Sequence, residues 1–228
     1  MTLEETMAQI KPLDKNAMDV AAKRWDSIAK PLHSLGKMEK LVIQIAGITG
    51  NPDMKIQKRA LVPMCADNGV VEEGVTQTGQ EVTAIVAENF LSGDTSACVM
   101  SRQCGTKVIP VDIGMAVDTK VSKELKVAYG TANMTKGPAM TRAQAVQALE
   151  AGIEMVRRLK EEGYGLLATG EMGIGNTTTS SAVASVLLDR SVEEMTGRGA
   201  GLSSDVDEIN LSLLKNKGIN YLALGHIH

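Results

Sequence analysis

The segment Gly170–Ser181 carries the residue types best suited to chemistry in this chain of 228 residues. It follows an apolar run, Tyr164–Thr169, that predicts a buried strand, and it leads into Ala182–Leu188, which predicts a helix. Glycines followed by hydroxyl and amide side chains at a helix start offer backbone N–H groups to an anion. The acid within it, Glu171, is unfavourable beside a phosphate unless it has a role of its own. We therefore expect a nucleotide-handling site, the alternative being a glycine-rich turn whose threonines only cap the helix.

Three further segments have the composition of binding loops. Asp67–Gly74 carries three acids, and its alternative is a solvated turn in which Asn68 and Gly69 provide a left-handed conformation. Thr76–Gln80 could supply polar contacts to a flat ligand. Gly197–Gly201 is either a second anion contact or a flexible break.

The elements that must position these segments alternate between short apolar runs and stretches with helical spacing. Such an order predicts an α/β fold in which parallel strands are joined by right-handed helical crossovers. Ligands of open α/β sheets bind beyond the carboxyl ends of the strands, where the glycine-rich segments follow. The expected strands are Ala60–Ala66, Lys107–Ile113 and Leu166–Thr169, and the expected helices are Asn16–Ala29, Gln80–Leu91, Ser96–Cys104 and Thr141–Glu162.

The composition argues against several classes of partner. A net charge of -3 gives no electrostatic reason to bind nucleic acid or an anionic membrane, and 2% aromatic residues leave few platforms for base stacking. We find no apolar run near the roughly 18 residues that span a bilayer. The three cysteines form no CxxC pair, which favours a reducing, cytoplasmic setting. Cys65, at a strand end without a histidine to activate it, is expected to be a buried thiol.

The order of the motifs is more specific than any one of them. The chain resembles the nicotinate-nucleotide:dimethylbenzimidazole phosphoribosyltransferases as far as about residue 204. The residues that carry the resemblance are Ser34–Glu39, Ile45–Gly47, Cys65–Val70, Glu73–Val75, Gln80–Thr83, Asn89-Phe90, Val111–Gly114, Gly137–Met140, Gly170–Thr178 and Gly197–Gly199.

This resemblance implies a Rossmann-like parallel sheet with flanking helices over residues 51–204. Residues 1–50 would form N-terminal helices of an incomplete small domain, and the protein would be a homodimer. In the implied reaction a nitrogen of 5,6-dimethylbenzimidazole, or a related azole, attacks C1′ of nicotinate mononucleotide. Nicotinate leaves and α-ribazole 5′-phosphate forms, a step in cobalamin synthesis. No metal or cofactor is implied.

The resemblance also implies roles for individual residues. Glu171 would act as an accessory catalytic residue that stabilises positive charge developing at C1′. The remaining implied residues bind substrate through the phosphate loop or along the wall of the benzimidazole. They are Asp67, Thr78, Gln80, Glu81, Gly173, Gly175, Asn176, Thr177, Thr178 and Gly199.

This sequence departs from the family pattern toward its end. The family's general base is a glutamate from a C-terminal part that has no counterpart here, so we expect impaired turnover. The alternative is a protein that binds a nucleotide or azole without turnover. Residues 205–228 form an atypical tail whose Gly225–His228 resembles the GHxH segment of calcineurin-like metallophosphoesterases. Two histidines cannot build a dimetal site alone, which disfavours a phosphoesterase fragment.

Overall fold

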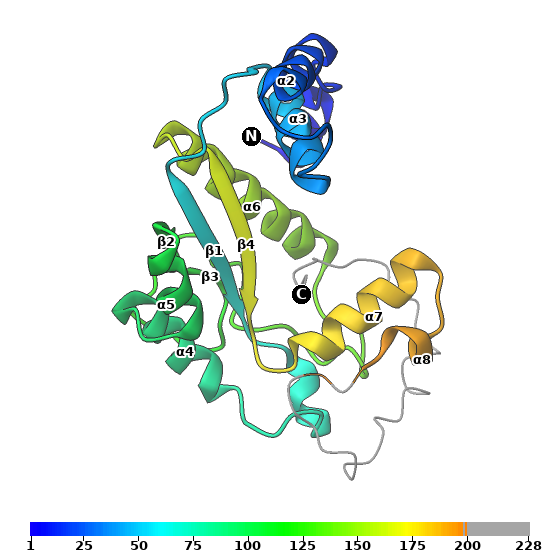
Figure 1. Ribbon diagram of the computed structural model, residues 1–228. Coiled ribbons are helices and arrows are strands. Elements are labelled where there is room, and N and C mark those ends of the chain that lie inside the picture. Colours follow the sequence, from blue (N-terminus) through cyan, green and yellow to red (C-terminus); the bar gives the residue numbers. More distant parts are fainter. Residues whose placement is uncertain (198, 200–228) are drawn as a thin grey trace. The chain divides into compact units, whose positions relative to one another are not determined.

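The computed structural model describes residues 1–197 and residue 199 (Figure 1). Contacts between residues divide the chain into two compact units, one spanning Thr2–Gln57 and the other beginning at Lys58. In the described residues, no helix combines the length and the apolar character needed to cross a membrane.

The first unit consists of three helices, α1 (Leu3–Gln9), α2 (Lys15–Ser27) and α3 (Lys37–Thr49). Helix α2 confirms the helix expected at Asn16–Ala29, and it begins where the Asp14 carboxylate accepts a hydrogen bond from the backbone of Ala17. Helices α2 and α3 pack closely, since a Cβ added at Gly47 would lie 2.6 Å from the side chain of Met18. A glycine at this contact therefore lets the two helices approach.

The second unit is built on a parallel sheet of β1 (Arg59–Ala66), β2 (Thr106–Val108), β3 (Val111–Gly114) and β4 (Leu166–Met172). Both β2 and β4 pair with the first residues of β1, so they lie along its opposite edges. Strand β3 continues along the β2 edge, where Met64 is opposite Val111. Strand β1 is thus the centre of the sheet.

Two of the expected strands differ from the structure. The strand expected at Lys107–Ile113 is divided into β2 and β3, because Pro110 has no N–H to donate to the ladder. Strand β4 runs on to Met172, so Glu171 lies in a strand and not in a loop. The strand expected at Tyr164–Thr169 is present from Leu166, but the prediction that it is buried was wrong, because every residue of β4 is exposed or half-buried. Among the described strands, β4 pairs only with β1.

The helices of the second unit follow the expected order. They cover both faces of β1: Ala60 and Val62 pack with Met155 and Leu159 of α6, whereas Cys65 packs with α4 (Figure 1). This alternation is the period of two that a strand imposes, and it confirms the α/β class with a parallel sheet and flanking helices. The helices are α4 (Glu81–Ser92), α5 (Ser96–Gln103), α6 (Arg142–Glu161), α7 (Asn176–Leu188) and α8 (Val192–Met195), with a 3₁₀ turn η1 at Gly69–Glu73.

Candidate functional site

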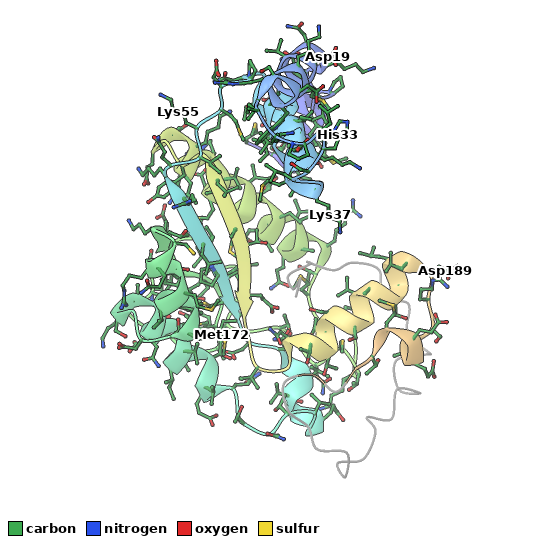
Figure 2. All side chains as sticks on the ribbon, viewed as in Figure 1. Asp19, His33, Lys37, Lys55, Met172 and Asp189 are labelled. Carbon is green, nitrogen blue, oxygen red and sulfur yellow. The ribbon has the colours of Figure 1, made fainter. Side chains whose placement is uncertain are left out.

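The candidate site lies at the carboxyl ends of β1 and β4. The two strands run in parallel with Cys65 opposite Met172, so the segments that follow them emerge side by side. Figure 2 labels Met172, the last residue of β4, from which the chain passes through a short turn into α7. The sheet therefore brings Asp67-Asn68 together with the start of α7, as the sequence predicts for an open α/β sheet.

The turn Gly173–Gly175 requires its glycines. A Cβ added at Gly173 would lie 2.2 Å from the carbonyl oxygen of Ala66, so no side chain fits there without a backbone shift. Gly175 has φ +83°, a left-handed conformation, and a Cβ there would lie 2.8 Å from the side chain of Val71. The turn is thus packed tightly against the chain that leaves β1.

In the described residues, the first backbone N–H groups of helix α7 have no side-chain cap. Its N-cap residue is Gly175, and the helix starts at Asn176, earlier than the start at Ala182 that the sequence predicts. The first N–H groups of a helix have no carbonyl partner within it, and the helix dipole adds partial positive charge at this end. The backbone N–H groups and hydroxyls of Thr177 and Thr178 therefore lie at an end suited to an anion.

Glu171 lies near the end of β4, shortly before this helix. Asn176 Nδ2 donates a hydrogen bond of 2.9 Å to Glu171 Oε2. Burial raises the pKa of the Glu171 carboxyl to about 7, and the hydrogen bond from Asn176 acts in the opposite direction. A carboxyl with this pKa changes its charge near neutral pH, which is the range in which a catalytic acid or base is useful.

Asn68 connects the segment after β1 to the turn and to α7. Its Nδ2 donates to the carbonyl oxygen of Ile174 at 3.1 Å, and its Oδ1 accepts from the hydroxyl of Thr179 at 2.9 Å. Its own carbonyl oxygen accepts a 2.9 Å hydrogen bond from Gln80 Nε2. This one buried residue therefore joins the segment after β1 both to the start of α4 and to the distant stretch from Ile174 to Thr179.

The start of α4 reaches the same turn. The hydroxyl of Thr83, which is fully buried, accepts a 3.0 Å hydrogen bond from the backbone N–H of Ile174. Through Thr83 and Gln80, the segment expected to line a flat ligand is fixed next to the segment expected to hold a phosphate.

The remaining predicted site residues take different positions. Gly199 lies next to the start of α7, since a Cβ added there would be 2.9 Å from the hydroxyl oxygen of Thr177. Asp67 is 1% exposed, and its Oδ2 accepts a 2.7 Å hydrogen bond from the backbone N–H of Ala116. Thr78 and Glu81 are exposed. The structure thus brings Gly173, Gly175, Asn176, Thr177, Gln80 and Gly199 toward one place, whereas Asp67 supports the loop after β3.

The structure corrects the interpretation of Asn68 and Gly69 as a left-handed turn. Asn68 and Gly69 do not form a left-handed turn: Asn68 is extended, and Gly69 is needed because a Cβ would lie 2.5 Å from the backbone at Thr131-Ala132. The connecting roles of Asn68, Thr83 and Thr179 were missed. The only sequence signal for them was a run of amide and hydroxyl residues at the ends of strands, because their partners are far along the chain.

The acids and thiols of the described residues do not point to metal or thiolate chemistry. Within the described residues, no group of three or more His, Cys, Asp or Glu side chains could hold a metal ion. Burial raises the pKa of the Cys65 thiol to about 12, and the negative charge of Asp112 adds to the effect. Cys65 is therefore the buried thiol that the sequence predicts, and not a thiolate nucleophile.

Comparisons with known proteins are consistent with this geometry. A family model described as Phosphoribosyltransferase matches residues 10–216. A protein of Ruminiclostridium cellulolyticum named nicotinate-nucleotide--dimethylbenzimidazole phosphoribosyltransferase is 48% identical over 218 residues, which are 95% of this chain and 62% of that protein. One of the same name from Clostridium tetani is 49% identical over 205 residues, 89% of this chain and 57% of the relative.

A solved structure of CobT from Thermus thermophilus is similar to this chain with a TM-score of 0.76 and 36% identity, over 88% of this chain and 59% of that one. The chain spans about 60% of the length of the relatives that it matches. The family match continues past residue 204, and the likeness of Gly225–His228 to metallophosphoesterases is not borne out; these four residues lie outside the described part of the structure. The chain belongs to the phosphoribosyltransferase family whose curated relatives are named nicotinate-nucleotide--dimethylbenzimidazole phosphoribosyltransferases.

Proposed function

We propose that this chain holds nicotinate mononucleotide and takes part in transferring its phosphoribosyl group to 5,6-dimethylbenzimidazole or a related azole. The products would be nicotinate and α-ribazole 5′-phosphate for cobalamin synthesis. The observation that carries the proposal is the juxtaposition of a glycine turn and uncapped helix start with the buried carboxyl of Glu171 on the preceding strand. The names of the relatives supply the reaction.

The 5′-phosphate would bind at the start of α7. Backbone N–H groups of its first turn and the hydroxyls of Thr177 and Thr178 can donate to phosphate oxygens, with the helix dipole adding to the attraction. Gly199 lies close enough to Thr177 that a larger residue would crowd its hydroxyl. The glycines at 173, 175 and 199 thus leave room for backbone and hydroxyl donors to approach the anion.

Glu171 would act on the sugar rather than on the phosphate. As the bond from C1′ to the nicotinate nitrogen breaks, positive charge grows on the ribose, and an ionised carboxylate placed nearby stabilises it. A pKa of about 7 means that the ionised form is available at and above neutral pH. The hydrogen bond from Asn176 holds one oxygen of the carboxyl in place.

The azole would lie along Thr78, Gln80 and Glu81, at the start of α4. Gln80 is held through its side-chain amide to the Asn68 carbonyl, and the exposed side chains of Thr78 and Glu81 are accessible to a ligand. Asp67 would support this region by holding the loop after β3.

We also propose a homodimer, with residues 1–50 contributing to a small domain, acting in the reducing cytoplasm. The resemblance to the family supports the dimer and the small domain. The three free cysteines support the reducing compartment. Sedimentation of the purified protein tests the dimer, which a monomer at micromolar concentration would contradict.

Product analysis tests the reaction. Purified protein is incubated with nicotinate mononucleotide and dimethylbenzimidazole, and free nicotinate and α-ribazole 5′-phosphate are separated by chromatography. We expect both products in equal amounts and above a control without enzyme. Calorimetric titration with nicotinate mononucleotide gives the affinity independently. Affinity without product would leave a binding protein, and absence of both would refute the proposed function.

The variant Glu171→Gln separates the two parts of the site. It retains the side-chain length and a hydrogen-bonding oxygen but removes the charge. We expect turnover to fall by about 10²-fold or more, while the affinity for nicotinate mononucleotide changes less than about tenfold. An equal loss of turnover and affinity would contradict the role assigned to Glu171.

A further inference from the structure

The backbone of Ile174 is held from both sides by side chains of other elements. Its N–H donates to the hydroxyl of Thr83 at 3.0 Å, and its carbonyl oxygen accepts from Asn68 Nδ2 at 3.1 Å. Ile174 is the middle residue of the turn Gly173–Gly175, so these two bonds fix the orientation of the peptide groups that lead into α7.

The two side chains are themselves held in place. Thr83 is fully buried in α4, and Asn68 is 7% exposed. The other side-chain atom of Asn68 that can bond, Oδ1, accepts from the Thr179 hydroxyl, while the carbonyl oxygen of Asn68 accepts from Gln80. Asn68 therefore has little freedom to rotate, and any change in its position moves the turn, α7 and Gln80 together.

We propose that Asn68, with Thr83, is a positioning residue that sets the Gly173–Gly175 turn relative to Gln80, and so aligns the mononucleotide with the azole. This inference rests on the proposed function. The glycines that make the turn tight also leave it free to change conformation, because glycine has a wider range of backbone conformations than any other residue. Two hydrogen bonds to Ile174 supply the restriction that the glycines do not.

The position of the turn relative to Gln80 affects the reaction because it sets the geometry of attack. Attack on C1′ requires the azole nitrogen to lie close to that carbon and in line with the leaving nicotinate, and small misplacements have large effects on rate. Asn68 touches neither reacting atom in this assignment. It acts through the carbonyl of Ile174 on one side and through Gln80 on the other.

The substitution Asn68→Asp tests the proposal with almost no change in size. The carboxylate still accepts from Thr179, but it repels the Ile174 carbonyl instead of donating to it. Thr179→Val is the matched comparison, because it removes the other hydrogen bond of the same side chain and leaves both bonds to Ile174. Thr83→Val removes the acceptor for the Ile174 N–H, and Thr83→Ser restores it.

The measurements are calorimetric affinity for nicotinate mononucleotide, KM and kcat, and the midpoint of thermal unfolding for each variant. We expect Asn68→Asp to lower kcat by about tenfold to a hundredfold, and to weaken mononucleotide affinity, with Thr83→Val in the same direction. Thr179→Val should change affinity by less than about threefold, and Thr83→Ser should stay close to the unmodified protein. If Asn68→Asp does not fold, the pair Thr83→Val and Thr83→Ser decides the matter.

A purely structural role predicts a different result, in which unfolding midpoints fall but the affinity of the folded variants is unchanged. That result, or equal losses in Asn68→Asp and Thr179→Val, would overturn the positioning role while the unmodified protein still binds. Failure of the unmodified protein to bind nicotinate mononucleotide would instead overturn the proposed function, and the positioning role with it.

Discussion

Asn176 donates a hydrogen bond of 2.9 Å to the carboxyl of Glu171, and the two residues belong to different elements, the start of α7 and the end of β4. The bond favours the ionised carboxyl, yet burial outweighs it and the pKa rises to about 7. The protein thus keeps a carboxyl whose ionisation is costly at the place where a positive charge would develop. Such a residue is expected to serve activity at the expense of stability.

The first prediction concerns Glu171→Gln and pH. Between about pH 4.5 and pH 7 the folded protein retains a proton that the unfolded chain has released, so the contribution of Glu171 to stability falls as pH rises through this window. The full shift corresponds to at most about 3 kcal/mol. We expect Glu171→Gln to be more stable than the unmodified protein at about pH 8, and equally stable at about pH 4.5, in urea unfolding.

An exposed acid provides the control for this experiment. Glu162 lies at the end of α6 with its side chain exposed. Glu162→Gln should show no such gain in stability at about pH 8. Equal behaviour of the two variants across the pH range would show that Glu171 ionises without a penalty.

The second prediction concerns the glycines of the turn. Gly173→Ala places a Cβ against the Ala66 carbonyl, and Gly175→Ala adds strain at a left-handed position. We expect each to destabilise the protein by about 1–3 kcal/mol, and to weaken mononucleotide binding. Gly152→Ala in α6 is the matched change, because a Cβ there meets no atom within 4 Å. It should stabilise the protein by about 0.5–1 kcal/mol. Denaturant unfolding gives the free energy of unfolding of the three variants, and a Gly152→Ala variant no more stable than the other two would contradict the prediction.

The third prediction concerns a buried ion pair between β3 and the loop that follows it. Lys126 Nζ lies 3.1 Å from Asp112 Oδ2, and both side chains are almost completely buried. Lys126→Met leaves the Asp112 charge without its partner, which we expect to cost about 3–5 kcal/mol. Asp112→Asn added to Lys126→Met should recover much of the loss, because the charge is then removed. A double variant no more stable than Lys126→Met in urea unfolding would show that the charge is not the cause.

The fourth prediction separates the cysteines by reactivity. Cys104 is exposed, whereas Cys65 and Cys98 are buried. With its pKa raised to about 12, Cys65 holds almost no thiolate at about pH 8. Iodoacetamide should modify only Cys104 in the native protein and all three cysteines in urea, as read by mass spectrometry of peptides. Modification of native Cys65 at a rate similar to Cys104 would contradict its burial.

The sequence predicts the sheet better than it predicts the site. Apolar runs and helical spacing identify β1, α4 and α6, because burial on both faces of the sheet imposes those patterns. The end of β4 and the start of α7 escape prediction, since Gly170 and Glu171 have low strand propensity and are held in the strand by pairing with Pro63 and Met64.

The connecting role of Asn68 is beyond any local pattern. Its partners Ile174 and Thr179 lie more than a hundred residues further along the chain, and nothing in the neighbouring sequence distinguishes it from a turn residue. The site's residue types were visible in advance, whereas the bonds between them depend on the tertiary pairing of β1 with β4.

That pairing has a consequence for the order in which the protein folds. Arg59 lies opposite Leu166, so the central ladder of the sheet closes only after the whole stretch between them has been brought round, which local structure cannot do alone. Distant contacts of this kind slow folding, because the intervening chain must be closed into a loop before they form. The hydrogen bonds that join Asn68 and Thr83 to the turn bridge a similarly long stretch of chain. Asn68 and Thr83 can therefore hold the turn only when β4 is paired with β1, so the geometry of the site depends on that pairing.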